Sequence, residues 1–223
     1  MKKRKILVLF YSLGGKTADL AREVAKGAAE VVDTEVIIKR VPELILEEVF
    51  EKNPALKERK EKLEKEFPET TIDDLTSADA VAFGTPVHFG SFASQIKQFI
   101  DQLSPVFAGG LMVNKPASVF CVSGSLHGGE ELTLISLIIP LLNLGMIPVG
   151  IPYPIQGAGP EFNAGSPYGA IFVSGAKGEK ELEEDDKMIA NILGRRLAMM
   201  AQLLNCGCER CNVCHDLTRK KHE

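Results

Sequence analysis

Three short stretches carry residue types suited to holding a cofactor. The first follows an apolar run at 5–11 and opens a helical pattern; it reads Ser12, Leu13, Gly14, Gly15, Lys16, Thr17. A nucleotide-triphosphate P-loop needs another glycine five positions before Gly15, where Phe10 stands, so that motif is excluded. Free backbone N–H groups and the dipole of a helix start favour an anion. Hydroxyls of Ser12 and Thr17 can donate to phosphate oxygens, so this first loop predicts a phosphate site; the alternative is that Thr17 only caps the helix.

The other two stretches suit a flat ligand. The second loop is stiffened by proline and offers an aromatic face; it reads Gly84, Thr85, Pro86, Val87, His88, Phe89, Gly90, Ser91. The third loop is built of small residues that let backbone amides approach a ring; it reads Ser123, Gly124, Ser125, Leu126, His127, Gly128, Gly129, Glu130. The second loop predicts one edge of a planar-ring site, unless His88 is an ordinary loop histidine. The third predicts another edge, unless it is only a flexible connector.

Four cysteines crowd near the end of the sequence in a C-x-C-x₂-C-x₂-C pattern, at Cys206, Cys208, Cys211 and Cys214. Four thiolates so close together can wrap one soft metal ion or an iron–sulfur cluster. Separated pairs are the commoner zinc pattern, so the tight spacing leans towards iron–sulfur; a disordered, oxidation-prone tail is the alternative. The fifth cysteine, Cys121, stands in a predicted strand and is read as a small core residue.

The elements that must position these loops alternate between strand and helix. Apolar runs predict strands at 5–11, 34–40, 80–84, 117–122 and 146–151. Apolar residues at helical spacing predict helices at 17–30, 92–103, 131–142 and 181–204. This order predicts an α/β fold, a doubly wound five-stranded parallel sheet with helices on both faces. Ligands of such sheets bind beyond the carboxyl ends of the strands, where all three loops fall.

Two segments depart from this alternation. Residues 42–67 are crowded with Glu and Lys and predict a solvated helix, with a partner-binding arm as the alternative. Residues 150–169 form a long Gly- and Pro-containing loop, a length typical of functional or disordered loops. The sequence divides into a cofactor-binding domain at 1–204 and a cysteine-rich tail at 205–223.

The length and composition of the chain exclude several classes of protein. The chain has 223 residues and a net charge of −4, so it has no broad basic surface for nucleic acid. The apolar run at 132–144 is too short to span a bilayer, which takes ~20 residues. The apolar run at 6–10 is shorter than the ~7–15 residues of a signal peptide. Clustered cysteines argue against a secreted disulfide scaffold. We expect a cytoplasmic protein.

The sequence resembles the flavodoxin-like NAD(P)H:quinone oxidoreductases of the WrbA type over residues 4–204. The matching stretches are KILVLFYS at 5–12, KRVPE at 39–43, FGTPVHFG at 83–90, QFIDQ at 98–102, KPASVF at 115–120 and GSPYGA at 165–170. The stretches FGTPVHFG and GSPYGA separate this family from plain flavodoxins. The cysteine tail is outside the resemblance.

The resemblance implies a flavodoxin-like fold and FMN as the cofactor. Its phosphate would be held by Ser12, Leu13, Gly14, Gly15, Lys16 and Thr17. Its ring would lie between two sets of residues: Pro86, Val87, His88, Phe89 and Gly90, and Ser123, Gly124, Ser125, His127, Gly128 and Gly129. Phe107, in place of a family Trp, and His88, in place of a common Arg, would contact the substrate. Gly14 and Leu144 also depart from the usual family residues, Tyr and His.

The implied activity is a ping-pong shuttle of two electrons from NAD(P)H to a quinone. The flavin carries the chemistry, so no catalytic side chain is expected. The alternative is a non-catalytic FMN protein, with or without an iron–sulfur centre, fed by a reductase partner. The long 150–169 loop favours the enzyme, whereas the altered family positions and the cysteine tail favour the carrier. The nearly all-apolar helix at 131–142 predicts a homo-oligomer, dimer or tetramer.

Overall fold

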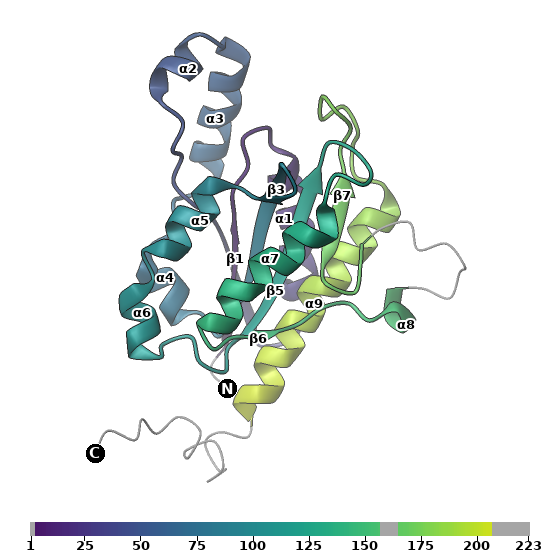
Figure 1. The fold of residues 1–223 in the computed structure, drawn as a ribbon. Helices are drawn as coiled ribbons and strands as arrows, with labels where there is room; N and C mark the ends of the chain where they lie inside the picture. Colours follow the sequence, from purple (N-terminus) through teal and green to yellow (C-terminus); the bar gives the residue numbers. More distant parts are fainter. Residues whose placement is uncertain (1–2, 157–164, 207–223) are drawn as a thin grey trace.

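A parallel β-sheet forms the centre of the fold in the computed structural model, which describes residues 3–156 and 165–206 (Figure 1). The strands lie in the order β2-β1-β3-β5-β6, with β7 also paired to β5. Their bounds are β1 Arg4–Phe10, β2 Thr34–Arg40, β3 Ala80–His88, β5 Pro116–Ser123, β6 Ile147–Pro148 and β7 Ala170–Val173. The strand order changes direction next to β1, so the predicted doubly wound sheet is confirmed.

The fifth strand position is shared by two short segments, and here the prediction of one strand at 146–151 is wrong. β6 pairs with Pro116 and Ala117 at the start of β5, whereas β7 pairs with the end of β5 from Phe120 to Ser123. Proline has no N–H to donate to a neighbouring strand, and Pro148 ends β6. The chain then leaves the sheet and returns at Ala170.

The third strand is longer than predicted. β3 extends to His88 because its last residues pair with β4, Ser91–Phe92, in an antiparallel hairpin. The predicted helix at 92–103 is also modified: α5 covers Ser94–Asp101 and a separate short helix, α6, covers Ser104–Gly109. Pro105 near the start of α6 fits this break, because proline is tolerated in a first helical turn.

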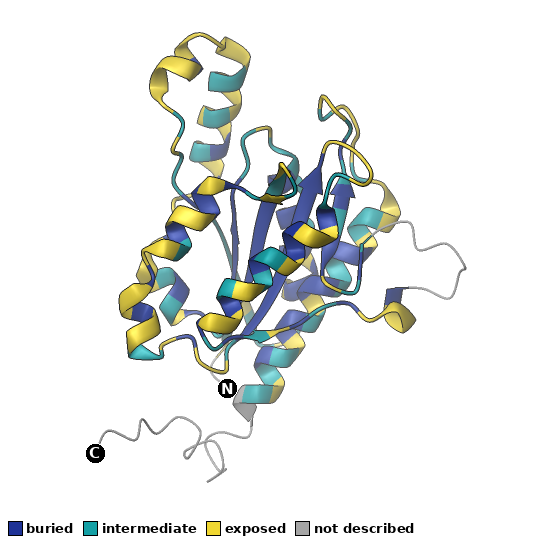
Figure 2. Cartoon of the chain, viewed as in Figure 1, coloured by how far each residue is buried: buried dark blue, intermediate teal, exposed yellow. Residues whose placement is uncertain are grey.

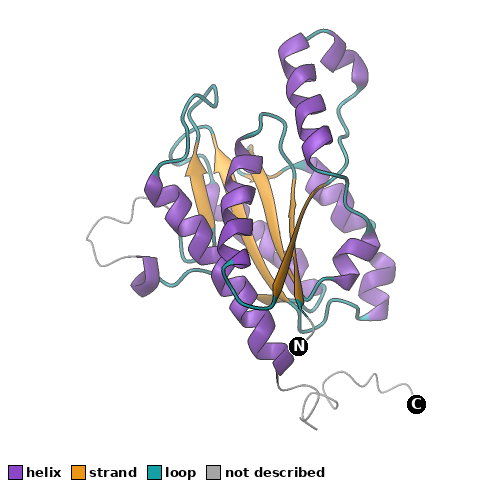
Figure 3. Ribbon diagram, turned by 180° about the vertical axis from the view of Figure 1, so that it is seen from behind, coloured by secondary structure: helices purple, strands orange, loops and turns teal. Residues whose placement is uncertain are grey.

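Helices cover both faces of the sheet, as alternate strand residues require. Ile6 and Val8 face a core that includes α1, Lys16–Ala29, and α9, Glu184–Cys206. Leu7 and Leu9 face the opposite core, formed with α5 and α7, Glu130–Asn143. The central strands β1, β3 and β5 are largely buried between these layers (Figure 2). Helices α1 and α9 lie in front of the sheet when it is seen from behind (Figure 3). No helix in the two described ranges is long and apolar enough to cross a lipid bilayer.

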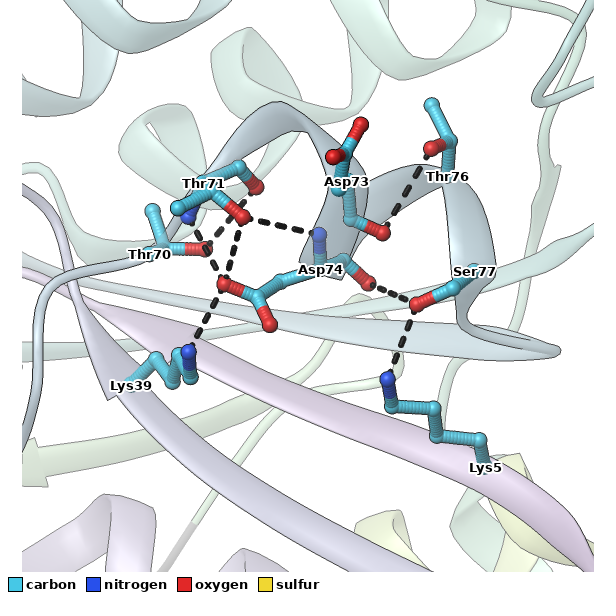
Figure 4. A network of polar contacts seen from close by, with 8 residues as sticks. All are labelled: Lys5, Lys39, Thr70, Thr71, Asp73, Asp74, Thr76 and Ser77. Carbon is cyan, nitrogen blue, oxygen red and sulfur yellow. Dashed lines mark hydrogen bonds and ion pairs between the residues drawn. The ribbon is translucent and has the colours of Figure 1, made fainter.

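Polar contacts fasten the small helix α4, Ile72–Ser77, to the edge of the sheet (Figure 4). The Thr71 hydroxyl accepts the Asp74 N–H at 3.1 Å, and the Asp74 carboxylate accepts the Thr71 N–H at 2.8 Å. Lys39 of β2 donates to the same carboxylate at 2.8 Å, and Lys5 of β1 donates to the Ser77 hydroxyl at 2.8 Å. This reciprocal cap fixes where the helix begins.

The charged segment 42–67 projects from the body as two helices, α2, Glu47–Glu51, and α3, Pro54–Glu66 (Figure 1). Most of α3 is exposed, as the charge pattern predicts, but Leu63 is buried in the core. The Lys60 ammonium lies 4.6 Å from the centre of the Phe50 ring and also pairs with Glu47 at 2.5 Å. The arm is therefore an ordered helical hairpin with its own contacts.

Two glycines let α1 and α9 approach closely. A Cβ atom on Gly27 of α1 would overlap the backbone carbonyl oxygen of Asn191 in α9. A Cβ atom on Gly194 of α9 would overlap the carbonyl oxygen of Val24 in α1. Backbone atoms cannot move aside as a flexible side chain can. The spacing of these two helices therefore depends on the absence of side chains at both positions.

We predict that Gly194→Ala lowers the free energy of unfolding by about 1–3 kcal/mol, the usual cost of overpacking. The loss should appear even though alanine is normally favoured over glycine inside a helix by up to about 1 kcal/mol. Gly109→Ala in α6 is the matched control, because the three atoms nearest to its Cβ would all belong to the flexible Leu111 side chain. Urea unfolding that gives Gly194→Ala the stability of the original chain would contradict the predicted helix contact.

Candidate functional site

A cleft of about 510 Å³ opens at the carboxyl ends of the strands. The first loop, the second loop and the third loop all contribute to its walls, as the fold predicts. Ten of the predicted cofactor residues line it: Ser12, Leu13, Gly14, Lys16, Thr17, Pro86, Val87, His88, Ser123 and Gly124. The volume lies within the range of about 300–1,000 Å³ that is typical of small-molecule sites.

The first loop is shaped to bind an anion. Gly15 is the cap of α1 and has a φ of +96°, a left-handed conformation that favours glycine. Its N–H donates to the Ser12 hydroxyl at 3.0 Å, which closes the turn. Thr17 lies buried in the first turn of the helix, so the alternative reading of Thr17 as the cap is wrong. Because the cap residue has no side chain, the helix start is left for a ligand to occupy.

Positive charge gathers around this loop. Among residues 3–156 and 165–206, three cationic side chains line the cleft, namely Lys16, Arg59 and Lys177, against a single carboxylate, Glu181. Lys16 and Glu181 form an ion pair, with 2.7 Å between Nζ and Oε1. Arg59 comes from the projecting helix α3, so the arm at 47–66 contributes to the cleft. The electrostatics of the cleft therefore suit a phosphate-bearing ligand.

The second loop is a tight hairpin whose strands face the cleft. Phe89 and Gly90 form its tip with φ values of +52° and +73°, the pattern of a two-residue type I′ turn. Pro86, Val87 and His88 line the cleft, but Phe89 is fully exposed and does not. Burial lowers the pKa of His88, so its imidazole is neutral at pH 7.

The third loop contributes only its beginning to the cleft. Ser123 and Gly124 line it, and the Ser123 hydroxyl donates to the buried Glu130 carboxylate at 2.8 Å. The remaining predicted residues of the second and third loops do not line it: Phe89, Gly90, Ser125, His127, Gly128 and Gly129. A Cβ atom on Gly129 would lie 2.8 Å from the Gly90 Cα, so the two loops support one another.

A fourth loop, Ser174, Gly175, Ala176, Lys177 and Gly178, completes the cleft and is absent from the sequence prediction. The Ser174 hydroxyl donates to the Ser123 carbonyl at 3.0 Å, which ties this loop to the third one. The available signal was the apolar run at 170–173 followed by two glycines. This run was not predicted as a strand because four residues are short for one. The predicted strand at 146–151 was also expected to be the neighbour of β5.

Two residues implied by the family resemblance lie elsewhere. Phe107 on α6 is exposed and does not line the cleft of its own chain. Figure 1 places α6 at the opposite end of the sheet. Leu144 is buried and directly follows the last residue of α7. The opposite end of this helix, at Glu130, is the end that lies near the cleft. Within one chain, neither residue is part of the site.

The predicted metal ligands lie largely outside the described residues. Cys208, Cys211 and Cys214 lie beyond residue 206, and only the backbone of Cys206 is described, at the end of α9. Their role as one ligand set stays a prediction. Among residues 3–156 and 165–206, no group of three or more His, Cys, Asp or Glu side chains could hold a metal ion.

The residues of the cleft fit FMN. The start of α1 offers backbone donors and a dipole to a phosphate. Cβ atoms placed on Gly14 and Gly15 would meet nothing within 4 Å, so the space above the phosphate loop is open. Backbone groups of the second and third loops, with neutral His88, border the rest of the cavity. A flat ring with polar edges suits these walls.

Comparison with solved structures confirms the flavodoxin-like fold. A flavodoxin, WrbA-like protein from Agrobacterium tumefaciens has a TM-score of 0.62 at 20% sequence identity, over 91% of this chain and all of that chain (100%). An apo NADH:FMN oxidoreductase has a TM-score of 0.56 at 18% identity, over 88% of this chain and 89% of that one.

Sequence comparison gives closer matches. The family model described as NADPH-dependent FMN reductase matches residues 4–161. A protein of Geotalea uraniireducens called NAD(P)H dehydrogenase (quinone) is 41% identical over 90% of this chain and 98% of its own length. One of the same name in Geobacter sulfurreducens is 39% identical over the same shares. With more than half of its length matched by the family model, this chain belongs to the NADPH-dependent FMN reductase family.

Proposed function

We propose that this protein is an FMN-dependent oxidoreductase that passes two electrons from NAD(P)H to a quinone. The observation that carries the proposal is the cleft at the start of α1, where the cap residue Gly15 has no side chain and three cationic side chains lie nearby. Family membership supports FMN as the cofactor, and relatives about 40% identical are called NAD(P)H dehydrogenase (quinone). Because NAD(P)H is a cytoplasmic metabolite, we place the reaction in the cytoplasm.

The residues of the cleft would divide the work of holding the cofactor. Ser12 and Thr17 with the backbone of Gly14, Gly15 and Lys16 would bind the phosphate. Pro86–His88 and Ser123–Gly124 would border the ring, and neutral His88 can hydrogen-bond a polar edge without bringing charge. FMN supplies the redox chemistry when bound, accepting a hydride from one substrate and giving two electrons to the other. The open cleft lets the two substrates use the same site in turn, which gives ping-pong kinetics.

We predict that NADH or NADPH alone bleaches the bound flavin under anaerobic conditions and that benzoquinone restores its absorbance. Steady-state rates should give parallel lines in double-reciprocal plots, because the nucleotide leaves before the quinone binds. If neither nucleotide reduces the flavin, the protein is an electron carrier fed by a separate reductase and the enzyme proposal is wrong.

Gly15→Leu tests whether the flavin sits on the first loop, because leucine is strained at φ +96° and fills the open space above the turn. This variant should purify colourless and inactive. Gly110→Leu is the matched control: Gly110 also has a left-handed φ, +62°, but caps α6 outside the cleft. It should lose stability in the same way and keep its flavin.

We propose that the protein forms a homo-oligomer, most simply a tetramer, through α7. Thr133, Leu134, Leu137 and Leu141 of this helix face the core. An exposed apolar stripe remains on the other side, at Leu132, Ile135, Ile139 and Leu142. Their spacing puts them on one face of the helix. In such an assembly the exposed Phe107 would contact the quinone in the cleft of a neighbouring subunit.

We predict that Ile139→Glu reduces the molar mass measured by light scattering, because the carboxylate would be desolvated in the interface. Val32→Glu is the matched control, since Val32 is an exposed valine in the turn before β2. It should keep the mass of the original protein. A mass of 24.3 kDa for the unaltered chain at micromolar concentration would argue against the interface.

We further propose that residues 205–223 form a separate tail whose cysteines Cys206, Cys208, Cys211 and Cys214 bind an iron–sulfur cluster or zinc. The pattern of four thiols supports this proposal. Because the tail follows α9 in the sequence, we expect the core of the cofactor domain to be independent of it.

We predict that protein purified anaerobically holds iron or zinc and that Cys208→Ser/Cys211→Ser removes the metal, because two of the four ligands are lost. FMN binding should be unchanged in the double variant. The check is elemental analysis of the full chain. If it finds less than about a tenth of an equivalent of any transition metal, the tail binds no metal and the proposal is wrong.

A further inference from the structure

Of the residues that the structure describes, one carboxylate lines the cleft, and it is paired with the lysine of the first loop. Lys16 Nζ and Glu181 Oε1 are 2.7 Å apart, and both residues line the cavity. The Lys16 side chain is only 17% exposed, whereas the Glu181 side chain is 82% exposed. Lys16 is the first residue of α1, so its ammonium is tethered at the helix start that suits a phosphate.

Glu181 is held opposite Lys16 by the fourth loop. The Gly178 N–H donates to the Gly175 carbonyl and the Lys180 N–H to the Ser174 carbonyl, both at 2.9 Å. Ser174 in turn bonds Ser123 of the third loop. The residue just before Glu181 is thus anchored to the cleft wall, while the Glu181 side chain itself is largely exposed to solvent.

The charge of Glu181 reaches the first turn of α1. Burial raises the pKa of Asp19, Arg22 and Lys16 oppose that rise, and Glu181 adds to it. A phosphate bound at the same turn would meet the same negative charge. An exposed ion pair is weak, and a phosphate accepts stronger charge-assisted hydrogen bonds, so the phosphate can displace the carboxylate.

We propose that Glu181 determines the affinity for FMN by competing with the cofactor's phosphate for the Lys16 ammonium. The Glu181 carboxylate pairs with the Lys16 ammonium when the cleft is empty. Once the phosphate has displaced it, the carboxylate repels the phosphate. Both effects weaken FMN binding and make the cofactor easier to exchange. The inference rests on the proposed function, because it takes the first loop as the FMN phosphate site.

The test compares FMN with riboflavin, which has the same ring and no phosphate. Dissociation constants for the apoprotein come from flavin fluorescence at low ionic strength. Glu181→Gln should bind FMN about three- to tenfold more tightly, since an exposed ion pair and a close repulsion are both removed. Riboflavin affinity should not change. Glu183→Gln is the matched control: Glu183 is exposed, two residues further on, and does not line the cleft.

A double-mutant cycle shows whether the effect passes through the lysine. Lys16→Met should weaken the binding of FMN and leave the binding of riboflavin unchanged. Adding Glu181→Gln to Lys16→Met should raise the FMN affinity by a smaller factor than Glu181→Gln does in the original protein. An unchanged FMN affinity in Glu181→Gln, or an equal gain for riboflavin, would overturn the competition while leaving the FMN proposal intact. If the original protein binds neither flavin, the proposed function fails and the inference falls with it.

Discussion

The close approach of α1 and α9 is the contact on which the site depends. Gly27 and Gly194 bring two helix backbones together without intervening side chains. Helix α1 begins at the first loop, and helix α9 begins just after the segment that carries Glu181. Fixing these helices against each other therefore fixes two walls of the cleft. A shift of α1 against α9 would move these two walls relative to each other. Stability and cofactor geometry are coupled here through backbone packing.

Much of the fold could be predicted from the sequence because buried parallel strands have a strong signature. The runs that became β1 and β5 are apolar on both faces, and the pattern of α1 and α9 is amphipathic. The edge strand β2 keeps an apolar centre at 36–38 between charged residues. The fifth strand could not be read in the same way. Its position is filled by Ile147–Pro148 and Ala170–Val173, neither of which is long enough to show a period. Pairing with opposite ends of β5 is a tertiary property that no local pattern contains.

The candidate site shows the same division. Loops that follow long strands were found, because the topology places their residues at one edge. The loop after β7 was missed with its strand, and Arg59 was missed because a charged surface helix gives no sign of which cation faces a cavity. Phe107 shows a different difficulty, since a position carried over from a family does not by itself tell whether the residue lines the cleft of its own chain.

Charge separates the cleft from the rest of the molecule. The chain as a whole has a net charge of −4, yet the described part of its cleft holds three cations against one carboxylate. An acidic surface around a basic cleft focuses the local potential on anionic ligands. FMN and NAD(P)H are both anionic, so one electrostatic arrangement serves the resident cofactor and the substrate that must come and go. The Glu181 carboxylate then has a clear consequence, because it weakens the binding of any phosphate that reaches Lys16. The proposed chemistry requires one anion to stay in the site while another leaves.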